Sequence, residues 1–156
     1  MSSAIQQTTV KAAVVECEIE IAAPPAKVFG AFVDEINEWF YESEETRHDR
    51  ITCLEPELGG RFYIASRDGS DQNLLALVTM IKKNREIRLR GDCTIPEAFV
   101  ANMTVKFEEA GDDTRVKVIH RMAGAFSDDL PAGFESGWMD GLAKLKSLVE
   151  RQAASG

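Results

Sequence analysis

The sequence predicts an α+β domain in which a broad antiparallel sheet lies against one long C-terminal helix. Between about residues 51 and 122, apolar and polar residues largely alternate, as in strands with one face in solvent. Near the C-terminus, apolar residues instead recur at intervals of three and four, which places them on one face of a helix. These residues are Phe134, Trp138, Leu142, Leu145 and Val149. Helices on one face of an antiparallel sheet define the α+β class.

The first elements are a strand and two short helices. Residues 1–9 are polar, and we expect them to be flexible. From Val10, apolar and acidic residues alternate until Ala23-Pro24-Pro25, which predicts a half-buried strand. A proline is well tolerated in a first helical turn, and the apolar residues between 28 and 40 keep helical spacing. A break near Asp34 should divide this segment into two helices.

Six further strands complete a predicted sheet of six or seven strands. They are expected at about residues 51–54, 61–67, 74–81, 87–91, 99–109 and 114–122. The segment 74–81 is apolar almost throughout, so it is either covered on both faces or contains a β-bulge. Pro131 should open the final helix. The expected domain spans 10–151, with a flexible tail at 152–156.

Composition narrows the possible functions. A formal net charge of −8 over 156 residues argues against nucleic acid and anionic membrane surfaces as partners. No apolar stretch reaches the length of a membrane span, and no secretory signal is visible, so we expect a cytoplasmic protein without membrane insertion. The three cysteines should be reduced thiols. We predict no metal site, no cofactor and no catalytic residue, because neither ligand spacing nor a nucleophile motif is present.

Several short segments resemble those of a known protein family. They are residues 19–29 (IEIAAPPAKVF), Trp39-Phe40, Leu58-Gly59-Gly60-Arg61-Phe62, residues 78–81 (VTMI) and residues 137–145. In this order they resemble the START-like (SRPBCC, Bet v 1-like) superfamily, particularly the branch named for the activator of Hsp90 ATPase homologues. The resemblance covers residues 14–151. It implies a helix-grip fold, in which the sheet curls around the C-terminal helix and leaves an apolar cavity between them.

Strand parity and helical spacing select residues that should face this cavity. The candidate ligand-binding residues are Trp39, Phe62, Ile64, Leu89, Phe99, Met103, Val118, His120, Phe134, Trp138 and Leu142. The alternative is a filled core without any ligand. His120 is the one titratable member, and it could orient a ligand, take a proton, or simply bond a backbone carbonyl.

Two glycines flank Trp138 in the predicted helix. Gly137 and Gly141 each cost about 1 kcal/mol of helix propensity relative to alanine. Such a cost is explained if a strand or a ligand approaches the helix backbone closely, and we expect a strand.

The first functional hypothesis is a START-like protein that holds a small apolar molecule, such as a lipid, polyketide or aromatic compound. A polyketide cyclase-like enzyme is the second, with His120 and either Asp92 or Tyr63 supplying acid and base groups. A third is an interaction module resembling an Hsp90 co-chaperone, which would show an exposed apolar patch and no cavity. We rank it last because the family's two-domain co-chaperones have an N-terminal domain without a counterpart here. Homodimer formation is left open.

Overall fold

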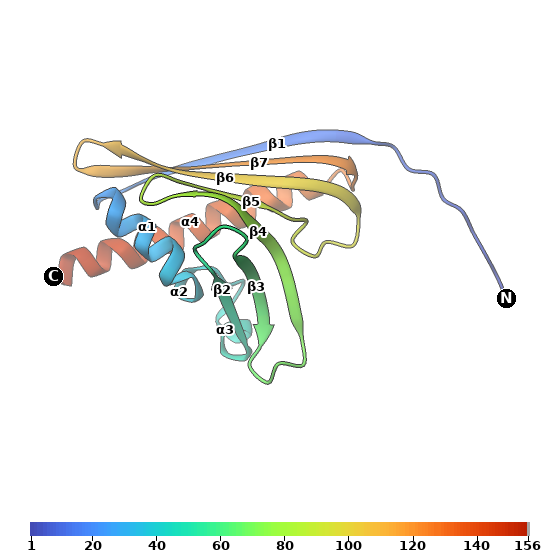
Figure 1. Cartoon of the computed structure of the whole chain (residues 1–156), viewed down its shortest axis with the longest axis horizontal. Coiled ribbons are helices and arrows are strands. Elements are labelled where there is room, and N and C mark those ends of the chain that lie inside the picture. The colour runs from blue at the N-terminus through green and yellow to red at the C-terminus, as the bar shows by residue number, and fades with distance from the viewer. Residues whose placement is uncertain (156) are drawn as a thin grey trace.

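Seven antiparallel strands form a single sheet in the order β1-β7-β6-β5-β4-β3-β2. The computed structural model describes residues 1–155, and Gly156, the last residue of the predicted tail, lies outside the described residues. The strands are β1 (Lys11–Ile21), β2 (Arg50–Leu54), β3 (Arg61–Ser66), β4 (Gln72–Lys82), β5 (Glu86–Arg90), β6 (Ala98–Ala110) and β7 (Asp113–Ala125). The sheet curls around helix α4 (Leu130–Ser155), and α1 (Pro25–Asp34) and α2 (Ile36–Trp39) lie on the same side (Figure 1). This confirms the predicted α+β, helix-grip architecture.

Strand β1 shows how the alternating sequence produces a two-sided sheet. Val15, Cys17 and Ile21 are buried against the helices. On the outer face, Glu20 pairs with Arg115 of the neighbouring strand β7 at 3.1 Å. Period-two alternation therefore divides the strand between core and solvent.

Strand β4 contains the bulge that its apolar sequence allowed. Phe62 of β3 pairs with Ala76, but the next residue, Tyr63, pairs with Leu74, so Leu75 is the extra residue. Leu75 and Ala76 are consecutive and both buried, whereas Leu77 is 41% exposed. Strand β4 is thus not covered on both faces. The bulge turns Leu75 inward, where it reaches the cavity described below.

Both predicted short helices are present as α1 and α2, and a third short helix, α3 (Glu44–Asp49), follows them. Ser43 caps α3, because its hydroxyl oxygen accepts a hydrogen bond from the Thr46 amide at 3.3 Å, and the Ser43 amide in turn donates to Thr46 Oγ1 at 3.2 Å. No residue of α3 is buried, so the sequence has no apolar periodicity there to reveal a helix. The predicted break near Asp34 is confirmed, since α1 ends at that residue.

Helix α4 packs its apolar face against the sheet. Trp138, Leu142, Leu145 and Val149 are buried, as the spacing predicted, and Phe134 is half-buried. At its C-terminal part, Glu150 accepts a hydrogen bond from the Ala22 amide at 2.9 Å. The helix continues to Ser155, so residues 152–155 are helical. The flexibility expected of the two chain ends stays a prediction.

Candidate functional site

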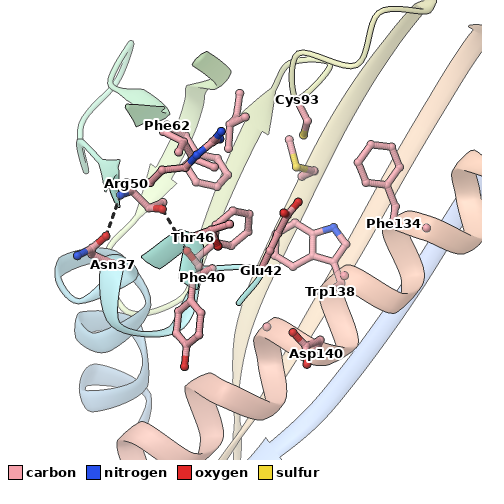
Figure 2. A pocket seen from close by; sticks show the side chains of 18 of the residues that line it. Asn37, Phe40, Glu42, Thr46, Arg50, Phe62, Cys93, Phe134, Trp138 and Asp140 are labelled. Atoms are coloured by element: carbon pink, nitrogen blue, oxygen red, sulfur yellow. Dashed lines mark hydrogen bonds between the residues drawn. The ribbon is translucent and has the colours of Figure 1, made fainter. Parts of the chain in front are cut away.

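A cavity of about 380 Å³ lies between α4 and the curled part of the sheet. This volume falls in the range of small-molecule sites, roughly 300–1,000 Å³. The segment from α2 to α3 and the loop after β5 complete the wall (Figure 2). The lining residues are Asn37, Phe40, Tyr41, Glu42, Thr46, Arg47, Arg50, Thr52, Phe62, Ile64, Leu75, Cys93, Ile95, Met103, His120, Gly133, Phe134, Gly137, Trp138, Asp140 and Gly141.

Aromatic rings form a continuous part of the cavity wall. The ring centroid of Phe40 lies 5.1 Å from that of Phe62 and 6.4 Å from that of Trp138, both in edge-to-face orientation. Three elements far apart in sequence supply these rings: the end of α2, β3 and α4. Figure 2 shows all three rings bordering one space. Such a surface suits a flat or apolar ligand, since edge and face contacts are both offered.

His120 is a completely buried polar residue in this wall. It comes from β7, where it pairs with Met103 of β6, and its ring contacts that of Phe134 in a tilted arrangement, with centroids 4.2 Å apart. The indole N–H of Trp138 donates a hydrogen bond to His120 Nδ1 at 3.1 Å. Among the described residues, His120 Nε2 has no hydrogen-bond partner.

Burial lowers the pKa of His120 from 6.5 to about 4, because an imidazolium would lose its hydration there. The ring is therefore neutral at physiological pH. Since Nδ1 accepts the indole hydrogen bond, the single ring proton resides on Nε2. His120 thus presents a hydrogen-bond donor, and the backbone-carbonyl contact considered from the sequence is not the one it makes.

The opposite side of the cavity is polar. Figure 2 shows Asn37 and Arg50 across the cavity from Phe134. Buried Thr52 holds this side together, because its hydroxyl donates to the Phe40 carbonyl at 3.1 Å and its amide donates to Asn37 Oδ1 at 2.9 Å. The Phe40 ring is thereby positioned by polar contacts outside the aromatic wall.

Tyr41 connects this polar side to helix α4. Lys144 Nζ donates to the Tyr41 carbonyl at 2.7 Å and lies 4.0 Å from the centre of the tyrosine ring. The Arg47 guanidinium lies 4.7 Å from the centre of the same ring. Two cation–π contacts and one hydrogen bond therefore hold the α2–α3 connection beside the cavity.

The loop after β5 brings Cys93 to the cavity in an unusual backbone conformation. Cys93 and Thr94 have φ values of 56° and 59°, the left-handed region that non-glycine residues rarely adopt. The Thr94 amide donates to Asp92 Oδ1 at 2.9 Å, and the Cys93 amide donates to the Leu75 carbonyl at 3.0 Å. Burial, with a smaller contribution from Asp92, raises the pKa of Cys93 to about 12. This thiol is protonated and is no nucleophile at neutral pH.

The candidate residues chosen from sequence divide into two groups. Phe62, Ile64, Met103, His120, Phe134 and Trp138 line the cavity. Trp39, Leu89, Phe99, Val118 and Leu142 are buried in the core outside it. Strand parity and helical spacing distinguish inward-facing residues from outward-facing ones. They do not show which inward-facing residues border a cavity and which belong to the filled core. Trp39 illustrates this, since its indole N–H donates to the Ala31 carbonyl at 3.3 Å and joins α2 to α1.

The expectation that a strand approaches Gly137 and Gly141 is wrong. A Cβ built on Gly137 would have nothing within 4 Å, and one on Gly141 would lie 3.3 Å from Trp39 Cζ3, a helical residue. Both glycines border the cavity. They leave space beside Trp138 instead of admitting a strand.

Sequence reasoning missed the lining residues of irregular segments and α3. Tyr41, Thr46, Cys93 and Ile95 belong to stretches without apolar periodicity, and Asn37 is a polar residue of α2.

Neither partner suggested for an enzymatic His120 lines the cavity. Asp92 is engaged in the turn with Thr94, and Tyr63 lies against the Arg61 guanidinium, 5.1 Å from the ring centre. Within residues 1–155, no group of three or more His, Cys, Asp or Glu side chains is arranged to hold a metal ion. In the same part of the chain, every helix is too short or too polar to cross a lipid bilayer.

The model of the family described as activator of Hsp90 ATPase homolog 1-like protein matches residues 22–150. The chain belongs to this family. The resemblance noted from the sequence is thereby confirmed. Comparison with the curated protein sequences gives no match.

Solved structures with the same fold come from several bacteria. A Rhizobium leguminosarum protein is 24% identical with a TM-score of 0.72, covering 94% of this chain and 99% of the other. Mll3558 from Rhizobium loti is 21% identical with a TM-score of 0.69, covering 89% and 98%. CalU16 from Micromonospora echinospora is 16% identical with a TM-score of 0.62, covering 94% and 90%. At these identities the comparison shows the shared fold alone.

Proposed function

We propose that this protein binds a small, mainly apolar molecule in the cavity between the sheet and α4. The observation that carries the proposal is the cavity itself, about 380 Å³ and lined by both aromatic rings and polar side chains. A lipid, polyketide or aromatic compound would place its apolar body against Phe40, Phe62 and Trp138. The co-chaperone-like alternative predicted that no cavity is present, so the cavity favours a ligand-binding protein.

The enzymatic alternative has less support. His120 is neutral with its proton on Nε2, so it can donate a hydrogen bond but cannot accept a proton at that atom. Asp92 and Tyr63, the partners considered for it from the sequence, do not line the cavity. Ligand binding without catalysis therefore agrees better with the geometry.

Thermal unfolding in the presence of a panel of lipids, polyketides and aromatic compounds tests the proposal. A ligand that binds only the folded protein raises Tm in a concentration-dependent way. Gly137→Leu should abolish the shift, because its side chain would occupy the open space beside Trp138. Gly30→Leu is the matched control, since Gly30 also has free space but lies on α1 outside the cavity wall. Equal shifts in both variants, or no shift with any compound, would contradict the proposal.

A further inference from the structure

His120 belongs to the cavity lining, and its Nε2 is a buried hydrogen-bond donor without a partner among the described residues. Buried polar atoms in folded proteins are almost always paired, because an unpaired one loses its hydration without compensation. Trp138 occupies the other ring nitrogen, so rotating the ring would exchange one unpaired nitrogen for the other. The rest of the ring is packed against Phe134. The partner of Nε2 is therefore a water molecule or an acceptor atom of a ligand that enters the cavity.

We propose that the ligand carries a neutral oxygen acceptor, such as a ketone, which receives the Nε2–H hydrogen bond of His120. This inference rests on the proposed function and specifies the chemical class of the ligand. Trp138 acts as a positioning residue, because its indole N–H assigns the ring proton to Nε2. The hydrogen bond would orient the ligand with its oxygen beside His120 and its apolar body along the aromatic wall.

A charged acceptor fits this position poorly. The groups nearest to His120 in the wall are Met103, Phe134 and Trp138, none of which can neutralise a carboxylate. Arg50 lies across the cavity from Phe134 (Figure 2). An ionised oxygen beside a neutral imidazole would thus be desolvated without a counter-charge. A ligand with a neutral oxygen at its buried end, and any charge toward the polar side, matches both ends of the cavity.

Two probes that differ in one atom group test the inference. 2-Acetylnaphthalene and 2-isopropenylnaphthalene have nearly the same shape, but the second replaces the carbonyl oxygen with a methylene group. Their Kd values are measured by calorimetry on the full chain. We expect the ketone to bind about tenfold more tightly, which corresponds to roughly 1.4 kcal/mol and to one buried hydrogen bond.

Variants separate the hydrogen bond from the apolar contacts. His120→Leu should bind the two probes equally, whereas Phe134→Leu should weaken both and keep the preference for the ketone. Because His120→Leu also removes the acceptor of Trp138 and could unfold the protein, ¹⁵N NMR of wild-type His120 provides a second measurement. The ketone should shift the Nε2 resonance, while the alkene should leave it unchanged.

The outcomes distinguish failure of the oxygen-acceptor proposal from failure of the ligand-binding function on which it rests. Equal affinity for both probes in the wild-type protein overturns the inference and leaves the ligand-binding function intact. A proton found on Nδ1 instead of Nε2 also overturns it. Binding of neither probe overturns it as well, and the compound panel then decides separately whether the cavity binds any ligand.

Discussion

The indole N–H of Trp138 donates to Nδ1 of His120 over 3.1 Å, and this bond joins α4 to β7 inside the protein. Trp138 is 6% exposed and His120 is 0% exposed. The pair is therefore shielded from bulk water, and the protonation state of His120 is coupled to the position of Trp138. Stability and ligand recognition should both depend on it.

Acidification should destabilise the protein through His120. Its pKa is about 4 in the folded protein and 6.5 in the unfolded chain, so the unfolded chain binds more protons between these values. The free energy of unfolding should fall as pH drops from about 6.5 to 4, by at most about 3 kcal/mol. Above pH 6.5, where His120 is neutral in both states, it should not change the free energy of unfolding. Urea unfolding at a series of pH values measures the effect.

The titration of His120 can be observed directly in His48→Gln, which leaves His120 as the only histidine. Its imidazole resonances should remain those of the neutral ring down to about pH 4. Hydrogen bonds lower the pKa values of Glu55 and Asp68 to about 2. Their contribution to the free energy of unfolding should therefore be lost only below about pH 4, near the carboxyl pKa of the unfolded chain. A midpoint near 6.5 for His120 would contradict the burial argument.

Gly137→Ala should stabilise the protein by about 0.5–1 kcal/mol, because alanine is the better helix former and its Cβ meets open space. Gly30→Ala on α1 should give a similar gain without touching the cavity. Gly141→Ala should gain less, since its Cβ would lie 3.3 Å from Trp39 Cζ3. Denaturant unfolding of the three variants measures these differences. A loss of stability in Gly137→Ala would show that the space beside Trp138 is occupied.

Lys144→Ala should loosen the segment between α2 and α3. The side chain holds the Tyr41 carbonyl and ring, so its removal should speed amide hydrogen exchange in residues 40–49. Because Lys144 is partly exposed, we expect a loss of global stability below about 1 kcal/mol. A bound ligand should also dissociate faster from this variant.

Lys146→Ala is the matched control for that experiment. Lys146 lies two residues after Lys144 on α4. Its Nζ donates hydrogen bonds to the Glu20 carbonyl of β1 and to the Glu150 carboxylate, both at 2.8 Å. Exchange in residues 40–49 should not change in this variant. Equal acceleration in both lysine variants would mean that the effect arises from helix α4 as a whole.

Cys93 should react slowly with alkylating reagents. With its pKa raised to about 12, its thiolate fraction near pH 7.5 is on the order of a thousandfold below that of an ordinary thiol with a pKa near 8.5. Peptide mapping after timed iodoacetamide treatment gives its rate, with glutathione as reference. A cavity ligand should slow the reaction further. Alkylation of Cys93 at the glutathione rate would show that the loop opens readily.

Local sequence patterns predicted the elements that bury an apolar face. Strand β1 and the apolar face of α4 were visible, because each has a regular spacing of apolar residues. Helix α3 was missed because it buries nothing, and a capping box of two hydroxyl side chains is too small a signal beside six acidic residues between 34 and 45. The cavity residues of the α2–α3 segment were missed for the same reason.

The sequence by itself determined the fold class, the family and the inward position of His120, since periodicity reports which side of an element faces the core. Whether that interior is filled or hollow depended on the tertiary structure. Leu89 and Phe62 have the same inward parity, yet only Phe62 reaches the cavity. Curvature of the sheet, the bulge at Leu75 and the irregular loop at Cys93 decide where space remains, and these arise from contacts between segments distant in the chain.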